Sequence, residues 1–222
     1  MSQLNTRIVA LLLVLPLLPS ASPGQSRDQK TIDAILVLVN DDIITRTDLL
    51  WSLALDPKAP SPAGAVNSEL LRQKLDVMID ERLVAQEAAR IPAADVSRDE
   101  INAARTTLIA GFGSEAAFRQ RVESVGLTSD RIDDLIRRRI LIDRFIDFRF
   151  KSFVFVSEQD VKRYYDEHLA PELRRAGQIA PPLERVRDRI VPIVKQEKVN
   201  EEVDRFLNTI RQRAEIVQLA EP

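Results

Sequence analysis

The side chains that could carry acid–base or metal chemistry are few and scattered. The single histidine, His168, stands beside Asp166 and Glu167 near the end of an expected helix. A general base needs partner groups, and none is visible in the pattern, so contact with the helix C-terminus and solvent is favoured. The absence of cysteine excludes disulfides and thiolate metal sites. The sequence therefore predicts no catalytic residue, no metal ligand and no cofactor.

Four short motifs contain residues that could form a site. Asp41-Asp42 could be paired carboxylates, but adjacent acids in a turn usually serve turn formation. Asp133-Asp134 are expected on the solvated face of a helix. Gly111-Phe112-Gly113 lacks the rest of a phosphate-binding loop. The run Arg137 to Arg139 could contact an acidic partner or lipid headgroups, although a solvated helical face paired with nearby acids is favoured.

Phenylalanine gives the strongest signal, because five of the eight lie within eleven positions: Phe145, Phe148, Phe150, Phe153 and Phe155. Two helical turns cannot direct all of these rings into one core. Either the segment is buried on all sides, or part of it lines an apolar groove that would bind extended apolar peptide. The candidate peptide-binding residues are Phe145, Phe148, Phe150 and Phe153.

Composition is that of a folded protein, with 45% hydrophobic and 30% charged residues. The balance of 32 basic and 34 acidic residues argues against nucleic acid as a general partner. The 222 residues correspond to one or two domains.

Residues 1–24 have the pattern of a secretory signal peptide. Arg7 precedes an apolar run from Ile8 to Leu18, and small, turn-forming residues follow. A membrane-spanning helix would need ~20 apolar residues, so an uncleaved anchor is the weaker alternative. We expect cleavage between Ala21 and Gly24, export, and no stable membrane insertion afterwards.

Downstream, the pattern predicts a hairpin followed by helices. The expected helices are 47–55, 68–90, 97–109, 114–126, 129–151, 157–168 and a last one that begins at 182. Pro192 lies inside this last helix, where it should cause a kink or remove one backbone hydrogen bond. Residues 171–182 are expected as a polar connection, and residues 214–219 as a strand.

The first strand, Ala34 to Val39, is apolar on both faces, which is typical of a central strand with neighbours on both sides. Ile43-Ile44 can pair with one edge and Glu215 to Leu219 with the other. The predicted fold class is mainly α: a multi-helix core with a small sheet formed by the N-terminal hairpin and the C-terminal strand.

The order of these segments resembles the SurA family of periplasmic chaperones. "IDAILVLVNDDIITRTDL" is similar to the family's opening strand, turn, strand and capped helix. "LLRQKLDVMIDERLVAQEAARI" and "PPLERVRDRIVPIVKQEKVNEEVDRFLNTIRQRAEIVQL" are similar to its next helix and to its C-terminal helix and strand. The resemblance covers Thr31 to Leu219, and it lies in the order of the segments rather than in any single motif.

In that family, the two terminal parts form one chaperone core, and parvulin-type prolyl isomerase domains are inserted between them. Lys151 and Leu183 here are about 32 residues apart, below the ~50 residues of a small domain, so the insertion is expected to be missing. The implied organisation is 31–156 as the N-terminal part of the core, 157–182 as a connecting helix and linker, and 183–222 as the completing helix and strand.

The resemblance implies an exported, periplasmic, ATP-independent chaperone rather than an enzyme. Its partners would be unfolded or nascent envelope polypeptides, including those bound for the outer membrane, held in an apolar groove. Two alternatives stay open: a prolyl isomerase of the same family with residual activity, and an envelope adaptor for one fixed partner.

Overall fold

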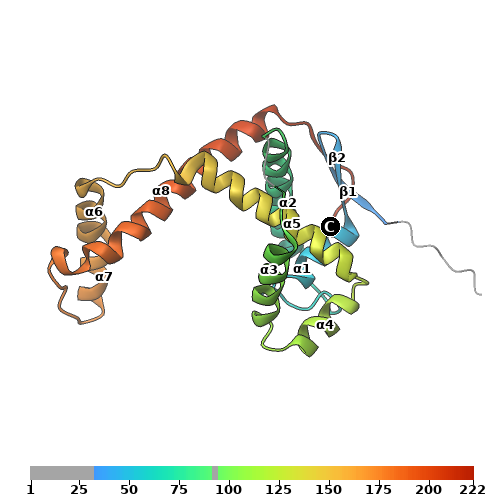
Figure 1. The fold of residues 1–222 in the computed structure, drawn as a ribbon, viewed down its shortest axis with the longest axis horizontal. Coiled ribbons are helices and arrows are strands. Elements are labelled where there is room, and N and C mark those ends of the chain that lie inside the picture. The colour runs from blue at the N-terminus through green and yellow to red at the C-terminus, as the bar shows by residue number, and fades with distance from the viewer. Residues whose placement is uncertain (1–32, 92–94) are drawn as a thin grey trace, which may run out of the picture. The chain divides into compact units, whose positions relative to one another are not determined.

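Strands from the two ends of the described chain meet in one antiparallel sheet, shown in Figure 1. The structure, a computed structural model, describes residues 33–91 and 95–222, so the predicted signal segment 1–24 lies outside the described residues. The strands are β1 (Ile35–Val39), β2 (Asp42–Thr45) and β3 (Ile216–Gln218), in the order β2-β1-β3. The prediction that the first strand is central is therefore confirmed.

Asn40 holds the hairpin turn and the C-terminal strand together. Its φ of 52° lies in the left-handed region, which asparagine tolerates better than most residues. Its backbone N–H donates to the carbonyl of Glu215 over 2.8 Å, and its side-chain Oδ1 accepts from the N–H of Glu215 over 2.9 Å. One turn residue thus fixes where the last strand begins.

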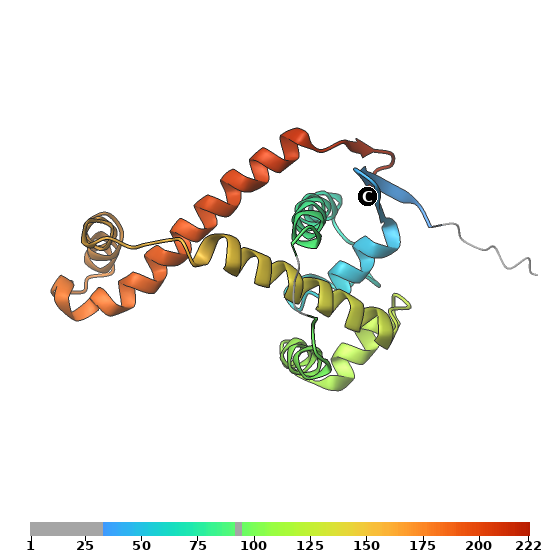
Figure 2. The ribbon, with the colours of Figure 1, turned by 45° about the horizontal axis from the view of Figure 1, so that its top comes forward.

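The rest of the described chain is almost entirely helical, which confirms the predicted fold class. Figure 2 shows the same helices from a second direction. The helices are α1 (Arg46–Ala54), α2 (Ser68–Ala89), α3 (Arg98–Ala110), α4 (Glu115–Glu123), α5 (Ser129–Ile146), the π-helical turn η1 (Asp147–Lys151), α6 (Glu158–Tyr164), the π-helical turn η2 (Tyr165–Leu169), α7 (Ala170–Arg175) and α8 (Leu183–Arg213).

Helix starts follow the capping signals in the sequence. The side chains of Thr45, Ser97 and Ser157 each accept a hydrogen bond from the backbone N–H three residues on, and the carboxylate of that residue accepts one from the N–H of the cap residue. Among the described residues, no helix is both long enough and apolar enough to cross a membrane.

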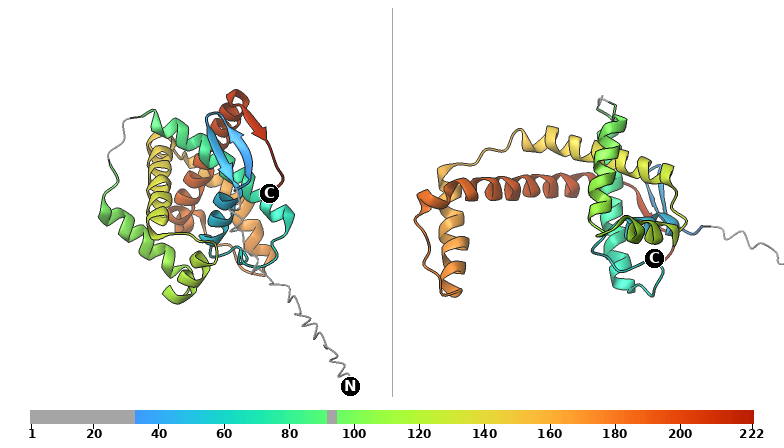
Figure 3. Two further views of the ribbon diagram at one scale, coloured as in Figure 1. Left: turned by 90° about the vertical axis from the view of Figure 1, so that its right-hand side faces the viewer. Right: turned by 60° about the horizontal axis from the view of Figure 1, so that its bottom comes forward.

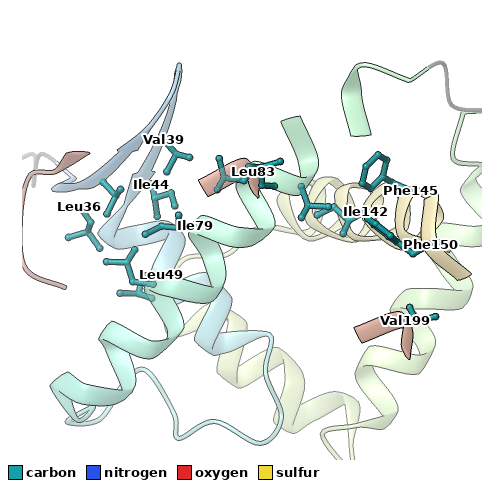
Figure 4. Packing of buried hydrophobic residues seen from close by; sticks show 14 residues of the cluster. Leu36, Val39, Ile44, Leu49, Ile79, Leu83, Ile142, Phe145, Phe150 and Val199 are labelled. Carbon is teal, nitrogen blue, oxygen red and sulfur yellow. The ribbon is translucent and has the colours of Figure 1, made fainter. Parts of the chain in front are cut away.

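Buried apolar residues gather in three clusters. The largest joins the sheet, α2, the end of α5 and the second half of α8, and Figure 4 shows its packing. A second joins α3, α4 and the first half of α5. The third lies between α6 and the first half of α8, around Val161 and Ile190. Helices α6 and α8 are in contact, and the right-hand view of Figure 3 shows them crossing near the start of α8.

One predicted boundary is wrong. Residues 171–182 were expected to be a polar connection, but helix continues through η2 and α7 as far as Arg175. Pro171 does not stop it, because proline is well accepted in the first turn of a helix. Pro192 likewise leaves α8 unbroken from Leu183 to Arg213.

Candidate peptide-binding surface

A π-helical turn determines which phenylalanines are buried. In a regular α-helix, residues five apart differ in direction by about 140°. In η1 one extra residue enters the turn, and the N–H of Ser152 donates to the carbonyl of Asp147, five residues back, over 3.3 Å. Residues five apart then project in similar directions. Phe145 and Phe150 consequently belong to the same buried cluster, whereas Phe148 and Phe153 are exposed.

The exposed fractions of the four candidate residues follow this division. Phe145 and Phe150 are 8% and 7% exposed. Phe148 and Phe153 are 62% and 67% exposed, far more than a large apolar side chain in a core. The core interpretation therefore applies to Phe145 and Phe150, and the surface interpretation applies to Phe148 and Phe153.

The buried pair belongs to an aromatic cluster that the sequence pattern did not reveal. Phe145 and Phe150 meet edge to face with ring centroids 6.3 Å apart. Phe206 of α8 completes the cluster, at 5.8 Å from Phe145 and 5.4 Å from Phe150. Figure 4 shows Phe145 and Phe150 with Ile142 on the same stretch of helix. These three rings pack η1 against α8. The backbone that carries Phe148 and Phe153 is therefore held in place by the cluster.

Phe148 stands at a hollow between α2 and α5, which we call the α2/α5 hollow. Its volume of about 650 Å³ lies within the range of small-ligand sites. Most of its lining is apolar: Ala85, Ala88, Ala89, Ile91, Val96, Leu141, Ile142, Phe145 and Phe148. Such a surface can take apolar side chains out of water.

Phe153 stands at a second hollow, between η1 and α8, which we call the η1/α8 hollow. Its volume is about 460 Å³. Phe150, Phe153, Val154 and Phe206 provide its apolar lining, and Arg149, Glu202, Arg205 and Thr209 provide its polar lining. Two exposed phenylalanines five residues apart, one in η1 and one in the turn after it, thus each line a hollow.

An ion pair connects the helices beside the α2/α5 hollow. Arg144 of α5, which lines this hollow, contacts Glu100 of α3. The N–H and hydroxyl of Ser97, followed by the Arg144 guanidinium, lower the pKa of Glu100 to about 2. Glu100 is therefore a fixed negative charge at neutral pH, and it serves the helix cap rather than proton transfer.

The other sequence candidates show no catalytic arrangement. His168 stacks on Tyr164, with ring centroids 5.3 Å apart, and Asp166 pairs with Lys162. Asp133 pairs with Arg105 and Arg98, and its side chain is only 16% exposed, so the expected solvated face does not hold for this residue. In the part of the chain that the structure describes, no group of three or more potential ligands could hold a metal ion.

The arginine run is only partly as predicted. Arg137 pairs with Asp134 over 2.8 Å, and Arg139 pairs with Glu81 over 3.0 Å. Arg138 differs: it is half-buried and makes neither a hydrogen bond nor an ion pair to another described residue. The expectation of a paired, solvated face is wrong at this position.

The geometry defines a mainly helical protein with apolar hollows beside exposed aromatic rings and no recognisable catalytic centre among the described residues.

Comparison with known proteins confirms the resemblance predicted from the sequence. The chain is 27% identical over 157 residues to Chaperone SurA of Chromobacterium violaceum, covering 68% of this chain and 36% of that protein. It is 29% identical over 153 residues to Chaperone SurA of Ralstonia nicotianae, covering 66% and 30%. It is 26% identical over 150 residues to Chaperone SurA of Cupriavidus pinatubonensis, covering 66% and 30%.

The chain therefore spans about a third of the length of the curated relatives it matches. No protein-family model matches it. The similarity to these SurA chaperones supports a chaperone-like function in general terms.

Proposed function

We propose that this protein is an exported, ATP-independent chaperone that holds unfolded or nascent envelope polypeptides, including those bound for the outer membrane. The observation that carries the proposal is the pair of exposed rings, Phe148 and Phe153, each at the edge of an apolar hollow. The similarity to SurA chaperones supports the same function.

The physical basis is desolvation of apolar client side chains. Burying apolar surface stabilises a complex by about 25 cal/mol per Å², and aromatic residues tend to dominate such contacts. Two separate hollows suit an extended segment, because side chains along an extended chain are regularly spaced. The charged side chains beside the hollows keep the loaded complex in solution, and no nucleotide is needed.

We further propose that residues 31–156 and 183–222 form the client-binding core and that 157–182 is a connecting segment in place of an inserted domain. In the structure, 157–182 contains only α6, η2, α7 and short links. The proposed location is the periplasm, reached through the signal segment.

The test is suppression of aggregation by a double variant, Phe148→Ser with Phe153→Ser. We expect the mature protein to suppress aggregation of several unrelated unfolded proteins without ATP, and the double variant to lose most of this activity. Both rings are largely exposed, so the variant should retain its melting temperature to within a few degrees.

Phe155→Ser is the matched control. Phe155 is 82% exposed but lines neither hollow, so its replacement should leave suppression unchanged. Equal activity of the double variant and the wild type would refute the assigned surface. Suppression for one protein alone would favour an adaptor with a fixed partner.

A further inference from the structure

Arg138 lies in an unusual electrostatic position. The charged groups that face it are Arg82 of α2, Arg131 of α5, Asp42 of β2 and Asp48 of α1. Three guanidinium groups thus gather around two carboxylates. Burial, followed by the two neighbouring arginines, lowers the pKa of Arg138. Among these five groups, the positive charges outnumber the negative ones by one.

Both carboxylates already serve other groups. Asp42 accepts a hydrogen bond from Gln86 over 2.9 Å. Asp48 accepts from the N–H of Thr45 in the helix cap and contacts Arg131 over 3.4 Å. The Nε of Arg131 is nevertheless buried without a hydrogen-bond partner in the described structure. The Arg131 guanidinium also lies over the Trp51 ring, 5.2 Å from its centroid.

Arg82 and Arg138 line a third hollow, bounded by α1, α2, α3 and α5, with a volume of about 510 Å³. We call it the α1/α5 hollow. Its apolar lining includes Leu55, Met78, Leu108, Leu135, Ile136 and Ile140. A hollow of this size accommodates one or two amino-acid residues.

The remaining charged side chains of this hollow are all paired. Lys74 contacts Asp56 over 3.1 Å, Arg139 contacts both Glu81 and Asp143, and Asp48 contacts Arg131. Arg82 and Arg138 make no such contact to any residue in 33–91 or 95–222. The α1/α5 hollow therefore combines an apolar interior with two unpaired guanidinium groups.

We propose that the α1/α5 hollow binds the free C-terminal residue of an extended apolar client. The terminal side chain occupies the apolar lining, and the α-carboxylate accepts hydrogen bonds from Arg82 and Arg138. Guanidinium and carboxylate are complementary in charge and can form paired N–H···O contacts. An internal aspartate or glutamate fits this hollow less well. Its carboxylate belongs to its own side chain, so the same residue cannot also supply an apolar side chain. The inference rests on the proposed chaperone function, which supplies such a ligand.

The test compares two forms of one peptide. An N-terminally fluorescein-labelled apolar heptapeptide ending in phenylalanine is titrated as the free acid and as the C-terminal amide, and binding is followed by fluorescence anisotropy. We expect the acid to bind at least tenfold more tightly than the amide. Added salt should reduce this ratio, since the contact is ionic.

Matched variants locate the effect. Arg82→Gln with Arg138→Gln should bring the ratio of the two affinities close to one, whereas Arg138→Lys should keep part of it. Arg137→Gln, which removes an exposed arginine paired with Asp134, should leave it unchanged. The double variant removes two of three mutually repelling positive charges, so it should melt no lower than the wild type. If it does not fold, Arg82→Gln alone should lower the ratio at least threefold.

Equal affinity for acid and amide would overturn the inference, as would a preference that survives in the double variant, or failure of both peptides to bind. Binding of dodecanoate without any preference for the acid peptide would assign the hollow to a fatty acid and also overturn it. Aggregation suppression in the Phe148 and Phe153 variants is measured separately, so failure of the carboxylate site can be distinguished from failure of the proposed function.

Discussion

Lys198 of α8 donates a hydrogen bond to Asp160 of α6 over 2.5 Å, and the carboxylate is almost fully buried. The N–H and hydroxyl of Ser157 donate to the same carboxylate. Lys198, followed by Ser157, holds the pKa of Asp160 well below its ordinary value. This contact joins two helices that also meet through the third apolar cluster and through the ion pair between Arg187 and Glu158.

Asp160→Asn should therefore destabilise the protein, since Lys198 would lose its anionic partner. We expect a loss of about 1–3 kcal/mol in the free energy of unfolding at pH 7. Asp166→Asn removes an exposed pair with Lys162 and should change stability by less than ~1 kcal/mol. Denaturant unfolding of both variants checks the prediction, and similar values for the two would contradict it.

The same contact predicts a pH dependence. The folded-state pKa of Asp160 is lowered, so its contribution is fully present above the unfolded value of ~3.9 and is lost as pH falls through the folded value. The stability difference between the wild type and Asp160→Asn should narrow progressively below about pH 4. Unfolding measured from pH 7 down to pH 2 tests this, and a constant or widening difference would refute it.

Removal of residues 214–222 should destabilise the fold strongly. Deletion takes β3 from the central strand and uncovers the end of α8, where Ile210 is buried. We expect a loss of several kcal/mol, a large share of a typical total of ~5–15 kcal/mol. A thermal melt within a degree or two of the full mature chain would show that the terminal pairing contributes little. Deletion of Glu221 and Pro222 alone is the control and should have a small effect.

The two kinds of phenylalanine should respond oppositely to truncation. Phe150→Ala removes a ring from the aromatic cluster and should cost about 3–5 kcal/mol. Phe148→Ala removes an exposed ring and should cost within ~0.5 kcal/mol. Chemical denaturation compares them directly, and equal losses would mean that the π-helical turn does not separate these residues in solution.

We expect no prolyl isomerase activity. Lowering the barrier of ~18–20 kcal/mol to rotation about an X–Pro bond needs an enclosed site that stabilises a twisted amide. Within 157–182, His168 stacks on Tyr164, and Tyr165 donates its hydroxyl to the carbonyl of Pro181. Catalysis of isomerisation in a proline tetrapeptide, at catalytic protein concentration, would contradict this expectation.

The sheet and most helix starts were predictable because they depend on local signals. Apolar residues on both faces of Ala34 to Val39 indicated a central strand, and capping residues indicated the helix starts at Thr45, Ser97 and Ser157. A strand with two apolar faces is best buried in the middle of a sheet. Its two neighbours could therefore be sought among the other predicted strands of the chain.

The division within the phenylalanine cluster could not be predicted in the same way. A period of 3.6 residues does not place Phe145 with Phe150, and only the added residue of η1 does. The repeated five-residue spacing, from Phe145 to Phe150 and from Phe148 to Phe153, was the available signal. The contact of Phe206 with the cluster and the lack of a partner for Arg138 both depend on how separate helices pack. The spacing of residues along one helix does not predict this packing.

The pairing of β1 with β3 also bears on when the protein can fold. Leu38 and Val217, which face one another across these strands, are separated by nearly all of the described chain. Contacts between residues so distant in sequence slow folding, because a long loop must close first. A chain that emerges N-terminus first presents its most apolar strand long before the partner strand exists. Its largest core can close only after the last residues have been delivered, so during synthesis this protein would itself need protection from aggregation.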